Sequence, residues 1–153
     1  MICMERETVR ANVNWYCRLR DVQYGAYESY ARRHGLTTKE LFVLGIIWFS
    51  PDGCSQTEIC ARMSATKQTV SAIVKKFIGM GYMELTESEQ DRRNKTIHLT
   101  DEGREYVGRI ILPAAEAEVD AMAELSGEEI EQLVALTHKF SLMMKQKFEE
   151  ADG

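Results

Sequence analysis

Two helix-start signals close together in the middle of the chain constrain its fold more than any other feature. Ser55 and Glu58 stand three residues apart, which is the spacing of a capping box. A second short helix, opened by Ser64 or Thr66, is predicted to continue to about Met80, where two nearby glycines end it. Two short helices joined by so tight a connection are typical of a helix-turn-helix unit.

The segments on either side predict further helices and one β-hairpin. An apolar run over 41–49 is expected to form a helix that is buried all round. Residues 82–86 and 96–99 alternate polar and apolar side chains, which indicates a hairpin with a long polar tip. The remaining helices are expected over about 7–34, 100–125 and 126–148. The expected fold class is therefore mainly α with a small β-hairpin.

The charge of the chain is distributed unevenly. Its 153 residues carry a net charge of −5. Residues 54–100 contain seven Lys and Arg against five Asp and Glu, whereas residues 101–153 contain five against thirteen. A mildly basic middle inside an acidic chain is where a DNA-reading module could lie.

Several functional classes are disfavoured by what the sequence lacks. The longest uncharged run, Leu41–Pro51, has eleven residues, and a membrane span needs about twenty. The N-terminus has no apolar stretch typical of a signal peptide, so we expect a cytoplasmic protein with no membrane partner. The four cysteines lack CxxC spacing and the three histidines are scattered, so no metal site is predicted. No P-loop or GxSxG motif occurs, and we expect neither an enzyme nor a cofactor.

The order of these elements and four short motifs together resemble the MarR family of winged-helix transcriptional regulators. The most specific motif is Asp91-Arg92-Arg93, which matches the D-x-R motif of the family's wing. Next, Leu99-Thr100-Asp101-Glu102-Gly103 is similar to the L-T-x-x-G that begins the following helix in the family. Two further segments, Thr69-Val70-Ser71 with Lys75 and Gly79-Met80-Gly81-Tyr82, match the recognition helix and its exit.

The resemblance implies a two-part architecture and a function. A winged helix-turn-helix lobe would comprise residues 37–100, on a helical dimerisation region formed by residues 1–36 and 101–153. A homodimer would present two recognition helices about one DNA turn apart to a pseudo-palindromic operator in double-stranded DNA. The implied function is a sequence-specific DNA-binding transcriptional regulator, expected to be a ligand-responsive repressor.

Helical geometry alone divides the side chains of the second short helix between two faces. Those expected to pack inward are Val70, Ile73, Val74, Phe77 and Ile78. The opposite face carries small and polar side chains, which close approach to base edges requires, while Lys75 and Lys76 are expected to hold phosphates. From this helix and the wing, the residues expected to bind DNA are Thr66, Lys67, Gln68, Thr69, Ser71, Lys75, Arg92 and Arg93.

For the wing, the resemblance implies that an arginine enters the minor groove, where narrow A·T-rich tracts attract arginine. The motif spacing favours Arg93 as this arginine, and Asp91 would orient the wing. The sequence departs from the family just before the motif, because Glu87-Ser88-Glu89-Gln90 stands where family wings often carry basic residues. Two added carboxylates should weaken non-specific affinity for DNA.

The resemblance also implies an effector pocket between the dimer layer and the lobe. An aromatic wall would suit a small aromatic effector by stacking, and the candidates are Trp15, Tyr16, Tyr27 and Trp48. Two alternatives stay open. One is a thiol-based redox regulator that uses Cys17, although the register of this cysteine differs from that of the family's peroxide-sensing branch. The other is a winged-helix dimer that acts mainly through protein–protein contacts, as its acidic charge allows.

Overall fold

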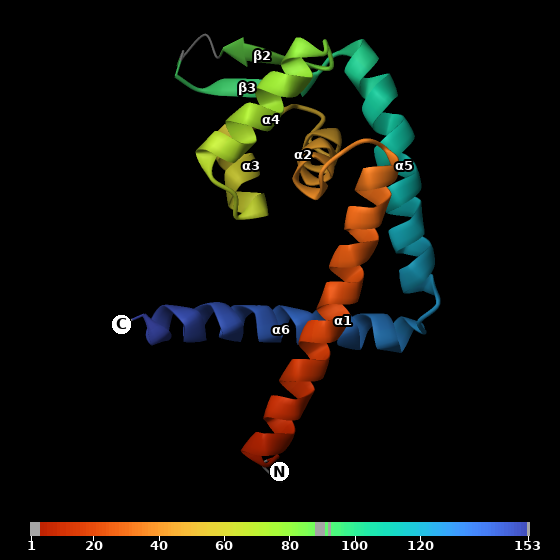
Figure 1. The fold of residues 1–153 in the computed structure, drawn as a ribbon, viewed down its shortest axis with the longest axis vertical. Helices are drawn as coiled ribbons and strands as arrows, with labels where there is room; N and C mark the ends of the chain where they lie inside the picture. Colours follow the sequence, from red (N-terminus) through yellow and green to blue (C-terminus); the bar gives the residue numbers. More distant parts are fainter. Residues whose placement is uncertain (1–3, 88–90, 92, 153) are drawn as a thin grey trace. The chain divides into compact units, whose positions relative to one another are not determined.

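A computed structural model of the chain describes residues 4–87, 91 and 93–152 (Figure 1). Its elements in chain order are α1 (Arg6–Arg33), α2 (Thr38–Trp48), β1 (Cys54–Ser55), α3 (Gln56–Met63), α4 (Lys67–Gly79), β2 (Met83–Glu87), β3 (Lys95–Leu99), α5 (Asp101–Ala123) and α6 (Gly127–Ala151). The predicted helices and hairpin are confirmed, each within a few residues of its expected bounds. The class is mainly α with a small antiparallel sheet, as predicted.

The chain divides into two compact units, residues 1–111 and 112–153, and the boundary falls inside α5. The first unit holds α1 to α4, the three strands and the start of α5. Every buried apolar side chain among the described residues belongs to this unit. The second unit consists of the rest of α5 and α6, and α6 has no buried residue.

The core of the first unit is built around α2. Thr37 caps this helix by accepting a hydrogen bond from the Glu40 backbone N–H. Its apolar positions then fall on all sides, and the buried ones are Leu41, Val43, Leu44, Ile46 and Ile47. The prediction that the whole run is buried was wrong at Phe49, which is 61% exposed. Phe49 lies beyond the last helical residue, so the packing of the helix does not cover it.

The sheet contains one strand more than the sequence predicts. Its strand order is β1-β3-β2 and all pairs are antiparallel. The predicted hairpin is confirmed, with Met83 opposite Leu99 and Glu87 opposite Lys95. The added strand, β1, pairs Cys54 with Ile97. Two residues are too short a segment for alternation to be visible in a sequence.

A network of close contacts joins the exit of α4 to the start of α5. The Thr100 hydroxyl donates to the Gly81 carbonyl at 2.6 Å and accepts from the Gly103 N–H at 3.0 Å, which confirms it as the cap of α5. The rings of Tyr82 and Tyr106 stack with centroids 4.2 Å apart. Gly103 is buried, and a Cβ at this position would overlap the backbone of Tyr82. Only glycine therefore permits this approach of α5 to the base of the hairpin.

We predict that Gly103→Ala destabilises the chain by about 1–3 kcal/mol, because a rigid backbone carbonyl must move to make room for the methyl group. Gly25→Ala serves as the control, since nothing lies within 4 Å of the position of its added Cβ, inside α1. That control should stabilise the protein slightly, by about 0.5–1 kcal/mol. Urea unfolding followed by circular dichroism measures both changes. Equal midpoints for the two variants would contradict the proposed close contact.

Candidate nucleic-acid interface

The recognition-helix candidate, α4, begins at a cap formed by Thr66. The Thr66 hydroxyl accepts from the Thr69 backbone N–H at 3.2 Å, and the two hydroxyl oxygens lie 3.0 Å apart. Ser64, which the sequence left as the alternative start, instead ends α3 in the left-handed conformation, with a φ of 51°. Both threonines therefore lie at the N-terminal end of α4, where free N–H groups and the helix dipole favour phosphate.

The two faces of α4 are arranged as helical geometry predicts. Val70, Ile73, Val74 and Phe77 are buried, and Phe77 is fully so. Ile78 is half-buried, because it lies at the last turn of the helix. On the opposite face the exposed residues are Lys67, Gln68, Ala72 and Lys75, with Thr69 and Ser71 partly exposed. This face thus presents short polar groups flanked by two lysines.

A side chain from α3 holds the start of α4. The Gln56 side-chain amide donates to the Lys67 carbonyl at 3.1 Å. Gln56 is the first residue of α3 and Lys67 the first of α4, so the bond ties together the N-terminal ends of the two helices. The capping box of Ser55 and Glu58, predicted from the sequence, is confirmed, and its Ser55 directly precedes Gln56.

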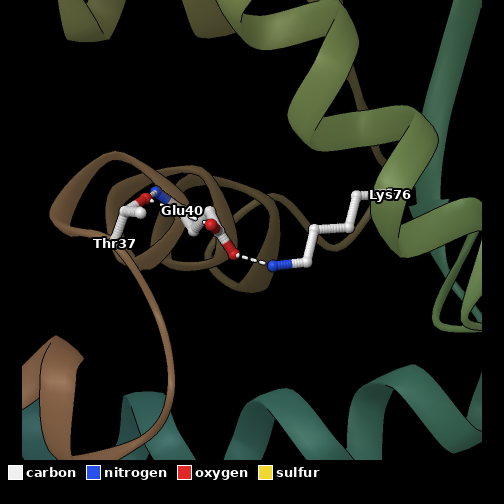
Figure 2. Close-up of polar contacts among 3 residues, drawn as sticks. All are labelled: Thr37, Glu40 and Lys76. Carbon is white, nitrogen blue, oxygen red and sulfur yellow. Dashed lines mark hydrogen bonds and ion pairs between the residues drawn. The ribbon is translucent and has the colours of Figure 1, made fainter.

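Lys76 was expected to hold a phosphate, but in the structure it pairs with an acidic side chain of α2. Its ammonium lies 2.7 Å from the Glu40 carboxylate of α2 (Figure 2). Successive residues of a helix are separated by about 100°, so Lys76 faces α2 while Lys75 faces solvent. Sequence reasoning missed Glu40, and the signal it overlooked was a carboxylate at the start of an otherwise apolar, buried helix.

The wing carries a turn organised by Asp91. Its carboxylate accepts from the Arg93 backbone N–H at 3.0 Å and from the Asn94 side-chain amide at 3.3 Å. The Asp91 carbonyl also accepts from the Asn94 N–H. This arrangement fixes the backbone from which the exposed Arg93 projects. Arg92 and the segment 88–90, where the added carboxylate of Glu89 was noted, lie outside the described residues.

The four candidate effector residues differ in exposure and in the side chains that surround them. Tyr27 packs edge-on against Phe42, with centroids 5.3 Å apart. Trp48 is half-buried, and the Arg104 guanidinium lies 5.8 Å from its ring centre. Trp15 and Tyr16 are exposed on α1, by 58% and 44%. The effector assignment of all four therefore stays a prediction.

Among the described residues, no group of three His, Cys, Asp or Glu side chains could hold a metal ion. Within the same ranges, no helix has both the length and the apolar character to cross a membrane. Cys17 is partly exposed and Cys54 is buried. Burial, together with the negative charge of Glu58, raises the pKa of the Cys54 thiol.

Comparisons with known proteins found one matching family model and several similar transcriptional regulators. A model described as MarR family matches residues 34–94. The chain is 31% identical over 85 residues to the HTH-type transcriptional regulator TtmR of Methylorubrum extorquens, covering 56% of this chain and 43% of TtmR. It thus spans less than half the length of that relative. It is also 27% identical over 117 residues to the regulator PapX of Escherichia coli, covering 76% of this chain and 67% of PapX.

Two solved structures are similar over most of the chain. One is NMB1585, a MarR family regulator from Neisseria meningitidis, with 25% identity and a TM-score of 0.71, covering 96% of this chain and 99% of that one. The other is MepR of S. aureus in a complex with DNA, with 25% identity and a TM-score of 0.69, covering 84% and 97%. The winged-helix fold is therefore shared along nearly the whole length.

We predict that Cys54 reacts with a maleimide more slowly than a free cysteine, because its raised pKa leaves less thiolate at neutral pH. The labelling rate of Cys54 should continue to rise at pH values above the pKa of a free thiol. Cys60, which is only partly buried, provides the internal reference. Mass spectrometry after short labelling pulses, with urea-unfolded protein as the control, measures each site. Faster labelling of Cys54 than of Cys60 would contradict the prediction.

Proposed function

We propose that the chain is a MarR-family winged-helix transcriptional regulator and that it binds a pseudo-palindromic DNA operator as a homodimer. Binding would repress transcription until a small aromatic effector releases the protein. The effector would act by a population shift, stabilising a dimer whose lobes are wrongly spaced for successive major grooves. The alternatives are a winged-helix dimer that acts mainly through protein–protein contacts and a redox regulator that uses the Cys17 thiol.

The observation that carries the proposal is the outward face of α4. Gln68 can form two hydrogen bonds with adenine, and Ser71 or Thr69 can bond several bases. Lys67 and Lys75 flank this face and are suited to phosphates. The helix is capped and its other face is buried, so the polar face is presented in one orientation.

The wing supports a second contact with the same DNA. Arg93 is exposed, and the Asp91 turn holds its backbone. Arginine is attracted to the strong negative potential of narrow minor grooves. With α4 in the major groove, the wing would read the adjoining minor groove. We propose Asp91 as the residue that orients the wing and Arg93 as the residue that contacts DNA.

The exposed apolar side chains of the outer helices support a homodimer. In a single chain α6 has no buried residue, yet its apolar side chains recur every three or four positions. Large apolar side chains exposed on the outer helices include Val9, Val13, Leu19 and Val22 of α1, Leu112, Val119 and Met122 of α5, and Leu133, Leu136, Met143 and Phe148 of α6. Exposed apolar side chains that gather on one surface mark association sites. We propose that a second copy covers them, on residues 1–36 and 101–153.

We predict that Leu136→Glu shifts the dimer toward monomer, because it places a charge within the proposed apolar interface. Leu136 is 65% exposed in the single chain, so the substitution should leave the lobe folded. Ser141→Glu adds the same charge at an exposed polar position of α6 and is the control. Sedimentation equilibrium measures the dimer dissociation constant of each. A monomeric wild type, or an unchanged constant in Leu136→Glu, would contradict the proposed dimer.

DNA binding is tested by fluorescence anisotropy with labelled duplex from immediately upstream of this protein's own gene. An unrelated duplex of equal length is the control, and both are titrated at several salt concentrations. We expect the upstream duplex to bind at least about a thousandfold more tightly, with two chains per duplex. Weak and equal binding to both duplexes, together with no sequence enriched from a random library, would overturn the proposal in favour of a protein-binding role.

Two variants of α4 distinguish contacts with bases from contacts with phosphates. We predict that Gln68→Ala lowers affinity for the specific duplex by about 1–3 kcal/mol and leaves non-specific binding unchanged. Lys75→Ala should weaken binding to both duplexes alike and reduce the slope of log affinity against log salt by about 1. The same anisotropy assay measures both. Equal losses on both duplexes for Gln68→Ala would contradict its assignment to base reading.

A further inference from the structure

Polar contacts anchor α4 near both of its ends. At the N-terminal end the Gln56 amide donates to the Lys67 carbonyl at 3.1 Å. Toward the C-terminal end the Lys76 ammonium donates to the Glu40 carboxylate at 2.7 Å. Nine residues separate the two anchored positions, which is about 14 Å along a helix axis. The face proposed to read DNA lies between these anchors.

The anchor at Glu40 is itself held in place (Figure 2). The Glu40 side chain is only 10% exposed, whereas that of Lys76 is 48% exposed. One oxygen of the carboxylate accepts from Lys76 and the other lies 3.3 Å from the Thr37 hydroxyl, which can donate to it. Glu40 belongs to α2, the helix at the centre of the core. Because a buried carboxylate without a cation is costly, Lys76 is held strongly at this position.

The ion pair adds what apolar packing cannot supply. Burial of the inner face of α4 decides which face points outward, but the hydrophobic effect is not directional and sets no bond length or angle. A hydrogen bond between charged groups has a preferred length and angle. A base contact by Gln68 requires donor–acceptor distances of about 2.7–3.2 Å, so shifts of about an ångström would abolish it. An anchor that resists such shifts therefore protects base recognition.

We propose that Glu40 is a positioning residue for base recognition: through Lys76 it fixes the orientation of α4, and it withholds Lys76 from the DNA phosphates. This inference rests on the proposed DNA-binding function. It assigns to α2 a part in specificity, although Glu40 itself touches no DNA. It also divides the neighbouring lysines, since Lys75 binds phosphate and Lys76 orients the helix.

A double-mutant cycle tests the assignment. Glu40→Gln, Lys76→Gln and the double variant are compared with wild type. The probes are a duplex that the wild-type protein enriches from a random-sequence library and an unrelated duplex of equal length. Glu28→Gln is the matched control, because it removes the same charge from an exposed ion pair with Arg32 on α1. Thermal unfolding of each variant confirms that it is folded, and Lys76→Gln, at the more exposed partner, is expected to be the milder change.

Each single variant should lose about tenfold in affinity for the enriched duplex without losing affinity for the unrelated one. The ratio of specific to non-specific affinity therefore falls. The double variant should bind the enriched duplex at least as tightly as the single variant with the lower affinity, because both substitutions remove the same ion pair. The salt slope of Lys76→Gln should equal that of wild type, and Glu28→Gln should bind both duplexes as wild type does.

Three results would overturn the assignment. If Lys76→Gln weakens binding to both duplexes equally and lowers the salt slope by about 1, Lys76 is a phosphate contact. If both variants melt at a lower temperature but keep the wild-type affinity ratio, the pair serves stability alone. If the wild type enriches no duplex, the DNA-binding function itself fails. The first two results leave the DNA-binding function intact, and only the third removes it.

Discussion

The burial of one face of α4 in the core decides which side chains of this helix are free to contact DNA. Val70, Val74 and Phe77 are almost fully inaccessible, and burying an apolar side chain of this size stabilises a fold by about 1.5–3 kcal/mol. No rotation of the helix that exposed these side chains could recover that free energy through polar contacts on the other face. The polar face is therefore left outside as a consequence of packing. The core helix α2, which also contacts α4, supplies Glu40.

Short, hydrogen-bonded connections hold the wing next to α4. β2 begins four residues after α4 ends, and the Thr100 hydroxyl holds the turn between them through the Gly81 carbonyl. Gly103 then allows α5 to touch the backbone of Tyr82. As a result the helix proposed for the major groove and the hairpin proposed for the minor groove belong to one compact unit. Thirteen of the 24 acidic residues of the chain lie beyond residue 100.

Patterns among residues close together in the sequence predicted most of the helices and the hairpin. The capping boxes at Ser55 and Ser126 and the periodicity of α4 depend on residues three or four apart, so a sequence displays them directly. The contact of Glu40 with Lys76 spans 36 residues, and it depends on how two helices cross, which no local pattern encodes. The strand β1 was missed because its two residues show no alternation, and Phe49 because a residue just past a helix end escapes the burial of that helix. The DNA-binding and effector residues were inferred from side-chain chemistry and resemblance, and they stay predictions.

Methylation of DNA by dimethyl sulfate tests whether α4 lies in the major groove and the wing in the minor groove, because the reagent modifies guanine N7 in the major groove and adenine N3 in the minor groove. We expect two clusters of protected guanine N7 atoms, whose centres lie about one helical turn apart on the duplex that the protein selects. Each cluster should be flanked by protected adenine N3 atoms, where Arg93 enters the minor groove. Unprotected N7 positions in a saturated complex would contradict the placement of α4. A single cluster would contradict the two-fold dimer.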